Sequence, residues 1–290
     1  MMKQLIQQVQ GNVVRAKNFC KEFRLYDLAS YSLNYVTPKH AFEKQAHLAY
    51  GLKSRQRLDL YRAKKPKPQR PLIVFVHGGS WQHGDKRDYL FVGESFTKEG
   101  YDVAIINYHL APKHIFPTYV DDLAQAIHYL AQNQTKLNIS TDHMILMGHS
   151  AGAFNVMSVV YSASSQLQYK DQIRAIIGLA GPYHFDYKGD SLAEHAFDPN
   201  VPYQQVMPYY FVESNQIKHY LLIAEQDQLV GKENTFDLDQ ALKAQGNHSH
   251  IAVIPKTGHI TLLATLSSLV SPYFKTKRTI LQLLDEALAH

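Results

Sequence analysis

Residues 144–152 read MILMGHSAG, and this stretch decides the fold that the sequence predicts. Its first four residues are apolar and predict a buried strand, whereas the residues after Gly152 follow a helical pattern. A sharp strand-to-helix turn between the two would hold Ser150 in a strained backbone conformation, with its Oγ above the edge of a sheet. Gly148 and Gly152 suit such a turn, because neighbouring backbone comes too close for side chains. The stretch therefore predicts a nucleophile elbow at Ser150.

A second motif precedes the elbow and predicts the groups that would stabilise an anion. Residues 77–81 read HGGSW and directly follow the apolar run LIVFV at 72–76. A serine nucleophile that transfers acyl groups needs backbone N–H groups aimed at the oxyanion of its tetrahedral intermediate. A glycine-rich loop beside the elbow supplies them. We expect the amides of Gly79, Ser80 and Ala151 to form this oxyanion hole.

A serine nucleophile also needs a base and an acid that orients the base. In hydrolases with this type of elbow, the acid and then the histidine follow the serine along the chain. Asp227 comes directly after the apolar run YLLIA, and His259 follows the last apolar run in the segment PKTGHITLL. These two residues are our candidates. Glu225 remains an alternative acid, and His248 and His250 remain alternative bases, although both lie at the start of a predicted strand.

Apolar runs alternate with helical patterns over most of the chain from residue 71 onward. Continuous apolar strands with helices between them are typical of an α/β fold, with a mostly parallel sheet covered by helices on both faces. We expect strands over residues 47–52, 57–61, 72–76, 103–108, 144–148, 175–180, 220–224 and 250–254, and helices over residues 89–98, 118–132, 151–161, 234–245 and 279–289.

The charge of the chain is unevenly distributed. Its 290 residues carry a formal charge of +5, but residues 1–70 hold 15 Lys+Arg against 4 Asp+Glu, whereas the remainder holds 15 against 21. The body is therefore acidic with a basic N-terminal segment, and the overall charge is no argument for a nucleic-acid partner. Cys20 is the only cysteine, which excludes an internal disulfide. Because the first residues lack the apolar run of a secretory signal or a membrane span, we expect a cytoplasmic protein.

Residues 1–30 carry apolar side chains at spacings that suit an amphipathic helix. We favour a helix that docks on the main domain, where it could cover the mouth of the site. The alternative is peripheral contact with an anionic membrane through the basic residues of the segment. These residues are Lys3, Arg15, Lys17, Lys21 and Arg24.

Taken together, the motifs resemble those of the α/β-hydrolase serine esterases, both the hormone-sensitive-lipase-like and bacterial carboxylesterase type and the related arylformamidase branch. The resemblance covers roughly residues 45–270. It rests on HGGSW at 77–81, NYHLAPKHIFPTYVDD at 107–122, GHSAG at 148–152, EQD at 225–227 and GH at 258–259. By this resemblance Ser150 is the nucleophile, His259 the general base and Asp227 the orienting acid. The loop has Ser80 where many relatives have a third glycine.

The resemblance also implies a domain organisation. Residues 46–290 would form the α/β-hydrolase catalytic domain, preceded by an N-terminal helical segment over residues 1–45. Residues 181–216 interrupt the strand and helix alternation with four prolines and many aromatic residues, which indicates an insertion. We expect the insertion and the N-terminal helix to form a small cap over the site.

The predicted function is a serine carboxylesterase that hydrolyses small or short-acyl esters. The alternatives are an arylformamidase that cleaves N-formylkynurenine and a catalytically silent hydrolase-fold binding protein. Trp81, Tyr183 and Phe185 are candidates for lining the substrate pocket, although core packing explains each of them nearly as well. The sequence contains no H-E-x-x-H, no P-loop and no G-x-G-x-x-G motif, so we predict neither a metal nor a cofactor. We expect a small-molecule ester as substrate.

Overall fold

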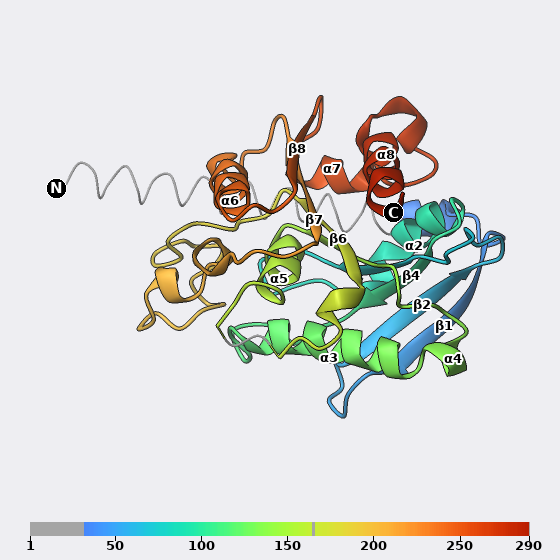
Figure 1. Ribbon diagram of the computed structural model, residues 1–290, viewed down its shortest axis with the longest axis horizontal. Helices are drawn as coiled ribbons and strands as arrows, with labels where there is room; N and C mark the ends of the chain where they lie inside the picture. Colours follow the sequence, from blue (N-terminus) through green and yellow to red (C-terminus); the bar gives the residue numbers. More distant parts are fainter. Residues whose placement is uncertain (1–31, 164–165, 290) are drawn as a thin grey trace.

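The computed structural model describes residues 32–163 and 166–289, which contain a sheet of eight strands (Figure 1). The predicted N-terminal helix over residues 1–30 lies outside the described residues. The order of the strands in the sheet is β1-β2-β4-β3-β5-β6-β7-β8. Their bounds are β1 Phe42–Ala49, β2 Arg57–Ala63, β3 Leu72–Val76, β4 Asp102–Ile106, β5 Met144–His149, β6 Ile173–Leu179, β7 Lys218–Ala224 and β8 Ser249–Ile254.

Six neighbouring strands of the sheet pair with one another in parallel. Strand β2 pairs antiparallel with both β1 and β4, whereas every pair from β4 through β3, β5, β6 and β7 to β8 is parallel. The carboxyl ends of the parallel strands therefore share one edge of the sheet, where ligands usually bind in such folds. This arrangement confirms the predicted α/β class with its mostly parallel sheet.

Helices cover both faces of the sheet. Helices α3 (Thr118–Gln132), α5 (Ala151–Ser158) and α6 (Glu233–Ala244) contribute to one hydrophobic cluster, and α2 (Leu90–Thr97), α7 (His259–Ala264) and α8 (Thr276–Leu288) contribute to a second. Figure 1 shows α3 and α5 on one side of the strands and α2 and α8 on the other. A short helix, α4 (Gln134–Leu137), follows α3, and 3₁₀ turns lie at Lys86–Tyr89, Lys170–Gln172, Tyr203–Gln205, Pro208–Phe211 and Ser271–Tyr273.

Strand β3 shows how one apolar run serves both faces. Ile73 and Phe75 belong to the cluster under α2 and α8, whereas Leu72, Val74 and Val76 belong to the cluster under α3 and α5. All five side chains are fully buried. Successive side chains of a strand point to opposite faces, so a strand buried on both faces has no polar positions.

The largest difference from the expected elements is at the edge of the sheet. The first strand was expected over residues 47–52 but runs over Phe42–Ala49, with a register shift between Gln45 and Leu48. Five of its eight residues are exposed. An edge strand of this kind lacks the apolar run by which the other strands were recognised. Helix α7 was also not expected. Among the described residues, no helix is long and apolar enough to span a membrane.

The turn between β5 and α5 leaves no room for a side chain at Gly148 or Gly152. Ser150 has φ 55° and ψ −123°, a region that L-residues rarely occupy. A Cβ on Gly152 would lie 2.1 Å from the backbone oxygen of Val76, and one on Gly148 would lie 2.2 Å from the oxygen of Gly152. Helix α5 thus begins in direct contact with the end of β3, which is where the HGGSW segment starts.

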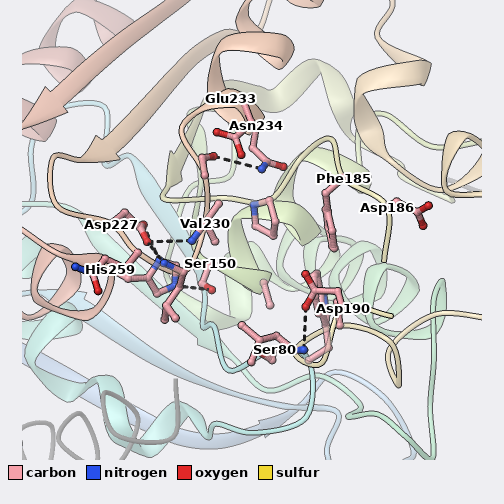
Figure 2. Close-up of a pocket in the computed structure, with 18 residues that line it drawn as sticks. Ser80, Ser150, Phe185, Asp186, Asp190, Asp227, Val230, Glu233, Asn234 and His259 are labelled. Carbon is pink, nitrogen blue, oxygen red and sulfur yellow. Dashed lines mark hydrogen bonds and ion pairs between the residues drawn. The ribbon is translucent and has the colours of Figure 1, made fainter. Parts of the chain in front are cut away.

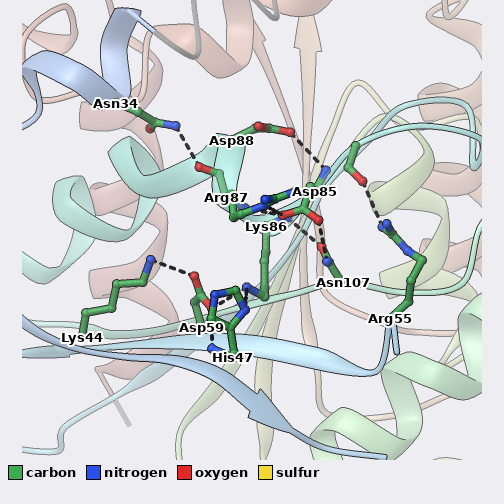
Figure 3. A network of polar contacts seen from close by, with 11 residues as sticks. Asn34, Lys44, His47, Arg55, Asp59, Asp85, Lys86, Arg87, Asp88 and Asn107 are labelled. Atoms are coloured by element: carbon green, nitrogen blue, oxygen red, sulfur yellow. Dashed lines mark hydrogen bonds and ion pairs between the residues drawn. The ribbon is translucent and has the colours of Figure 1, made fainter. Parts of the chain in front are cut away.

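A buried ion pair ties the β1–β2 hairpin to the segment that follows HGGSW (Figure 3). The Lys86 ammonium donates to Asp59 Oδ1 at 2.6 Å and lies 3.0 Å from Nδ1 of His47, and both charged side chains are almost completely buried. Lys44 contacts the other oxygen of Asp59 at 2.8 Å. Burial raises the pKa of Asp59, but the backbone N–H of His47 and the two ammonium groups outweigh it, and the pKa lies below its ordinary value.

Substitution Gly152→Ala should destabilise the fold by about 2 kcal/mol or more, because the new Cβ meets rigid backbone at 2.1 Å. Gly258→Ala is the matched control, since its Cβ would meet nothing closer than 3.7 Å and its φ of −98° suits any residue. Urea unfolding followed by circular dichroism measures both. Equal stability of the two variants would contradict the close contact between α5 and β3.

Substitution Asp59→Asn should lower the free energy of unfolding at pH 7 by about 3 kcal/mol, because it leaves the Lys86 ammonium buried without a carboxylate. The folded pKa of Asp59 is depressed, so its contribution is present above the ordinary pKa of about 3.9 and is lost as pH falls through the lower, folded value. The variant should therefore lose less stability than the wild type below pH 4.

Urea unfolding at pH 7 and at intervals between pH 5 and pH 3 measures this difference. Glu43→Gln is the control, because Glu43 pairs with Arg62 with its side chain 63% exposed and should contribute less than about 1 kcal/mol. A wild type and an Asp59→Asn variant with parallel pH profiles would show that Asp59 is not the titrating group.

Candidate active site

Ser150, Asp227 and His259 come from three separate loops at the carboxyl edge of the sheet. Ser150 follows β5, Asp227 follows β7, and His259 begins α7 after β8. Because β5, β7 and β8 run parallel through β6, their carboxyl ends lie at the same edge and bring the three side chains together. Figure 2 shows them converging on one side of a cavity.

The three side chains form a continuous chain of hydrogen bonds. His259 Nδ1 donates to Asp227 Oδ2 at 2.8 Å. On the other side of the ring, the Ser150 hydroxyl donates to Nε2 at 2.8 Å. The His259 and Asp227 side chains are only 2% and 6% exposed. This is the geometry that a serine needs to lose its proton to a base whose second nitrogen is held by a carboxylate.

The Asp227 carboxylate is itself held by the loop after β7. Its Oδ1 accepts the backbone N–H groups of Leu229 and Val230 at 2.9 and 3.0 Å. Burial raises the pKa of Asp227, but the neighbouring His259 and these hydrogen bonds outweigh it, so the pKa lies below its ordinary value. The carboxylate therefore stays ionised at neutral pH and can stabilise a positive imidazole.

The hydrogen-bonded side chains of Ser150, Asp227 and His259 line a cavity of about 400 Å³ (Figure 2). The four charged side chains in its lining are all carboxylates. In the part of the chain that the structure describes, no lysine or arginine lines this cavity. The lining residues are Ser80, Trp81, Ser150, Ala151, Pro182, Phe185, Asp186, Asp190, Leu192, Ala193, Asp227, Gln228, Leu229, Val230, Gly231, Glu233, Asn234 and His259.

Two of the three amides expected in the oxyanion hole belong to residues of this lining. Ser80 and Ala151 both line the cavity, and Ala151 is the first residue of α5, whose N-terminal amides point away from the helix. Gly79 is not part of the lining. It forms a tight turn instead, with φ 118° and its carbonyl accepting the N–H groups of Gln82 and His83.

Of the three expected pocket residues, Trp81 and Phe185 line the cavity and Tyr183 does not. Trp81 is held by a hydrogen bond from its Nε1 to Asn155 Oδ1 at 2.9 Å. The prediction for Tyr183 was wrong. Its side chain is fully buried, and its hydroxyl lies where a Cβ would sit on Gly178, so it fills space above β6 that a glycine leaves open.

The alternative acid and bases lie away from the cavity. Glu225 accepts the backbone N–H of Lys256 at 2.9 Å, and His248 pairs with Glu286 at 3.2 Å. His250 is an exposed residue of the edge strand β8. None of these three residues lines the cavity in the described part of the chain.

The insertion over residues 181–216 supplies one wall of the cavity and is fastened to the core by Phe197. The Phe197 ring meets Trp81 edge-on at a centroid distance of 4.9 Å and Phe154 of α5 edge-on at 5.6 Å. Backbone contacts add to this, since Phe116 N–H donates to the carbonyl of Ala196 at 2.9 Å. The wall is thus built on aromatic packing against the same tryptophan that lines the cavity.

Sequence reasoning missed most of the remaining lining. Leu192 and Ala193 belong to the insertion, and Glu233 and Asn234 lie at the start of α6. One signal was available for the second pair, because α6 follows the loop that carries Asp227 and so begins near the site. No comparable pattern marked the residues of the insertion.

Comparison with known proteins places this geometry among esterases and formamidases. The chain is 30% identical over 158 residues to the isoprenylcysteine alpha-carbonyl methylesterase ICME of Arabidopsis thaliana, which covers 51% of this chain and 37% of that protein. It spans 37–40% of the length of the first three plant methylesterases that it matches. It is 25% identical to the kynurenine formamidase of Drosophila melanogaster over 79% of this chain and 81% of that one.

Solved structures share the fold at low identity. Esterase B from Lactobacillus Rhamnosis superposes with a TM-score of 0.74 and 13% identity, covering 95% of this chain and 96% of that chain. The Francisella virulence factor BioJ superposes with a TM-score of 0.71 and 19% identity, covering 93% and 91%. These likenesses confirm the α/β-hydrolase fold that the sequence motifs predicted.

The match to a family model is more extensive than the partial matches to the plant relatives. The model named BD-FAE matches residues 58–242, a range that includes HGGSW, the elbow and the loop with Asp227. This range is more than half of the chain. The chain therefore belongs to the BD-FAE family of α/β hydrolases.

Proposed function

We propose that this protein is a serine carboxylesterase that hydrolyses small or short-acyl esters through an acyl-enzyme at Ser150. The observation that carries the proposal is the hydrogen-bonded chain from Asp227 through His259 to Ser150, which opens on a cavity of about 400 Å³. A cavity near the lower end of the usual range for ligand pockets favours a small substrate.

In the first half of the reaction, His259 accepts the Ser150 proton through Nε2 as Oγ attacks the ester carbonyl. The ring then carries a positive charge, which the ionised Asp227 carboxylate stabilises at 2.8 Å. The amides of Ser80 and Ala151 are the donors that we assign to the oxyanion. Gly79 acts by shaping the turn that presents Ser80.

The tetrahedral intermediate then collapses: the bond between the acyl carbon and the alkoxy oxygen breaks as His259 Nε2 gives its proton to the leaving alcohol, and the acyl group remains on Ser150. Water then attacks the acyl-enzyme with His259 again as base, and release of the acid regenerates the serine. No step requires a metal or an organic cofactor, because side chains carry out every proton transfer and backbone amides stabilise the oxyanion.

The carboxylates in the lining bear on the choice of substrate. Asp186, Asp190 and Glu233 surround the cavity together with Asp227, and no positive side chain of the described residues lines it. Their combined potential opposes the entry of anionic groups. We therefore expect neutral esters to be better substrates than esters whose acyl chain ends in a carboxylate.

A second candidate function is hydrolysis of an aryl formamide. The match to the Drosophila kynurenine formamidase favours it, because that match covers 79% of this chain and 81% of the relative. Both reactions pass through a tetrahedral intermediate on the same serine and differ in the leaving group, which is an alcohol in one and an aromatic amine in the other.

Substitution Ser150→Ala should lower the kcat for p-nitrophenyl acetate by about 10⁴-fold or more and abolish labelling by a fluorophosphonate probe. Asp227→Asn should lower kcat by about 10³–10⁴-fold with little change in KM, because it removes the charge that stabilises the imidazolium. Asp186→Asn is the control, since Asp186 lines the cavity outside the hydrogen-bonded chain and should change kcat by only a few fold. Wild-type activity in Ser150→Ala would overturn the assignment of the nucleophile.

A substrate panel separates the two candidate functions. We expect kcat/KM for p-nitrophenyl acetate and butyrate to exceed that for N-formylkynurenine. We also expect it to exceed that for the p-nitrophenyl hemisuccinate by about 10-fold, because of the carboxylate lining. Glu233→Gln should reduce the ratio of kcat/KM for the neutral esters to kcat/KM for the hemisuccinate. Glu286→Gln, which lies away from the cavity, should leave this ratio unchanged. Faster turnover of N-formylkynurenine than of every ester would replace the proposed activity with the formamidase.

A further inference from the structure

His149 lies at the centre of the site but is not part of the hydrogen-bonded chain. It is the last residue of β5 and directly precedes Ser150, and it is 3% exposed. Its ring centroid lies 4.9 Å from that of His259. It does not line the cavity, so direct contact with a bound substrate does not explain its place.

One side of the His149 ring holds the backbone of the proposed base. Its Nε2 lies 2.9 Å from the carbonyl oxygen of His259. A carbonyl oxygen only accepts hydrogen bonds, so Nε2 carries the proton and donates it. The bond joins residues 110 positions apart in the chain and links the nucleophile elbow directly to the first residue of α7.

The other side of the ring faces the proposed oxyanion loop. A Cβ built on Gly78 would lie 3.2 Å from His149 Nδ1 and 2.9 Å from the Cβ of Ser150. His149 therefore fills the space between the HGGSW loop and His259 while it is covalently joined to Ser150. One side chain thus contacts the three segments that must keep a fixed distance from one another.

The surroundings keep this ring neutral. Burial, and then the neighbouring His259, lower the pKa of His149 to about 3. The ring therefore carries a single proton at neutral pH. That proton is on Nε2, because Nε2 donates to the carbonyl oxygen of His259. It also does not compete with His259 for the proton of Ser150.

We propose that His149 is a positioning residue, whose Nε2–H bond to the His259 carbonyl holds the base at hydrogen-bonding distance from Ser150 Oγ. The inference rests on the proposed function, in which His259 is that base. Misplacement of a reacting group by about 1 Å can lower a rate by about 100-fold. Loss of this bond should therefore lower kcat while KM, which depends on the cavity lining, changes little.

The test uses the full chain with His149→Leu, His149→Gln and His149→Asn. A glutamine side chain is long enough to place an N–H near the position of Nε2, whereas the asparagine is about one bond too short. We expect His149→Leu and His149→Asn to lower kcat for p-nitrophenyl acetate by about 10- to 100-fold, with KM within about threefold of wild type. His149→Gln should recover most of the loss.

His219 offers a matched control within the same chain. It is fully buried, burial lowers its pKa to about 4, and its Nδ1 donates to the carbonyl of His248 at 3.0 Å, but it lies at the amino end of β7, at the opposite edge of the sheet from Ser150. His219→Leu should lower the melting temperature while kcat stays within about twofold of wild type. This comparison separates the loss of a buried histidine from the loss of this particular bond.

Three outcomes decide the proposal. A His149→Leu variant with kcat within twofold of wild type would overturn it, and so would a His149→Gln variant that falls as far as His149→Asn. If His149→Leu does not fold, the kcat of His149→Gln relative to that of His149→Asn still decides between the two results. If the wild type hydrolyses no ester and is not labelled by the fluorophosphonate probe, both the proposed function and this inference are wrong. If the wild type is active and His149→Leu has the same kcat, only this inference is wrong.

Discussion

The close approach of helix α5 to the end of β3 is the constraint on which the rest of the site depends. The first turn of α5 lies against the backbone of Val76, so closely that a single added methyl at Gly152 would lie 2.1 Å from a carbonyl oxygen. The same approach forces Ser150 into a positive φ and brings the HGGSW loop beside it. A strained residue of this kind persists only where its surroundings over-determine it, and here two strands and a helix do so.

The direction of the strands then places the other two side chains of the site beside Ser150. Because β5, β7 and β8 are parallel and lie in order across β6, the loops that leave them open on the same edge as the elbow. Asp227 and His259 need only short loops to reach Ser150. The backbone N–H groups of Leu229 and Val230 hold the Asp227 carboxylate in the orientation that the proposed mechanism requires.

The buried ion pair of Lys86 and Asp59 and the neutral ring of His149 lie in different parts of the fold and contribute in different ways. Lys86 and Asp59 fasten the edge hairpin to the segment after HGGSW, far enough from the cavity to act on stability. His149, by contrast, is kept neutral by burial and lies among the three segments of the site. The body of the chain is acidic, and the carboxylates in the cavity lining are part of that balance. The basic excess lies before residue 71, and it therefore bears on the N-terminal segment more than on the substrate.

The sequence by itself determined the fold class, the strands buried on both faces and the order of the motifs, because these depend on local patterns: apolar runs, glycines at a tight turn, and chain order. Ser150, Asp227 and His259 could be named as candidates for that reason. Only the tertiary structure decided which of the rival residues reach the cavity, that Tyr183 fills the core above Gly178 while Phe185 lines the pocket, and that Ser80 and not Gly79 faces it. It also decided that the edge strand begins at Phe42, because most residues of that strand are exposed and give no apolar pattern. These outcomes depend on which segments pack together, as in the pairing of Phe42 with Ala63 and the packing of Tyr183 over Gly178, and the residue pattern along the chain does not specify such contacts.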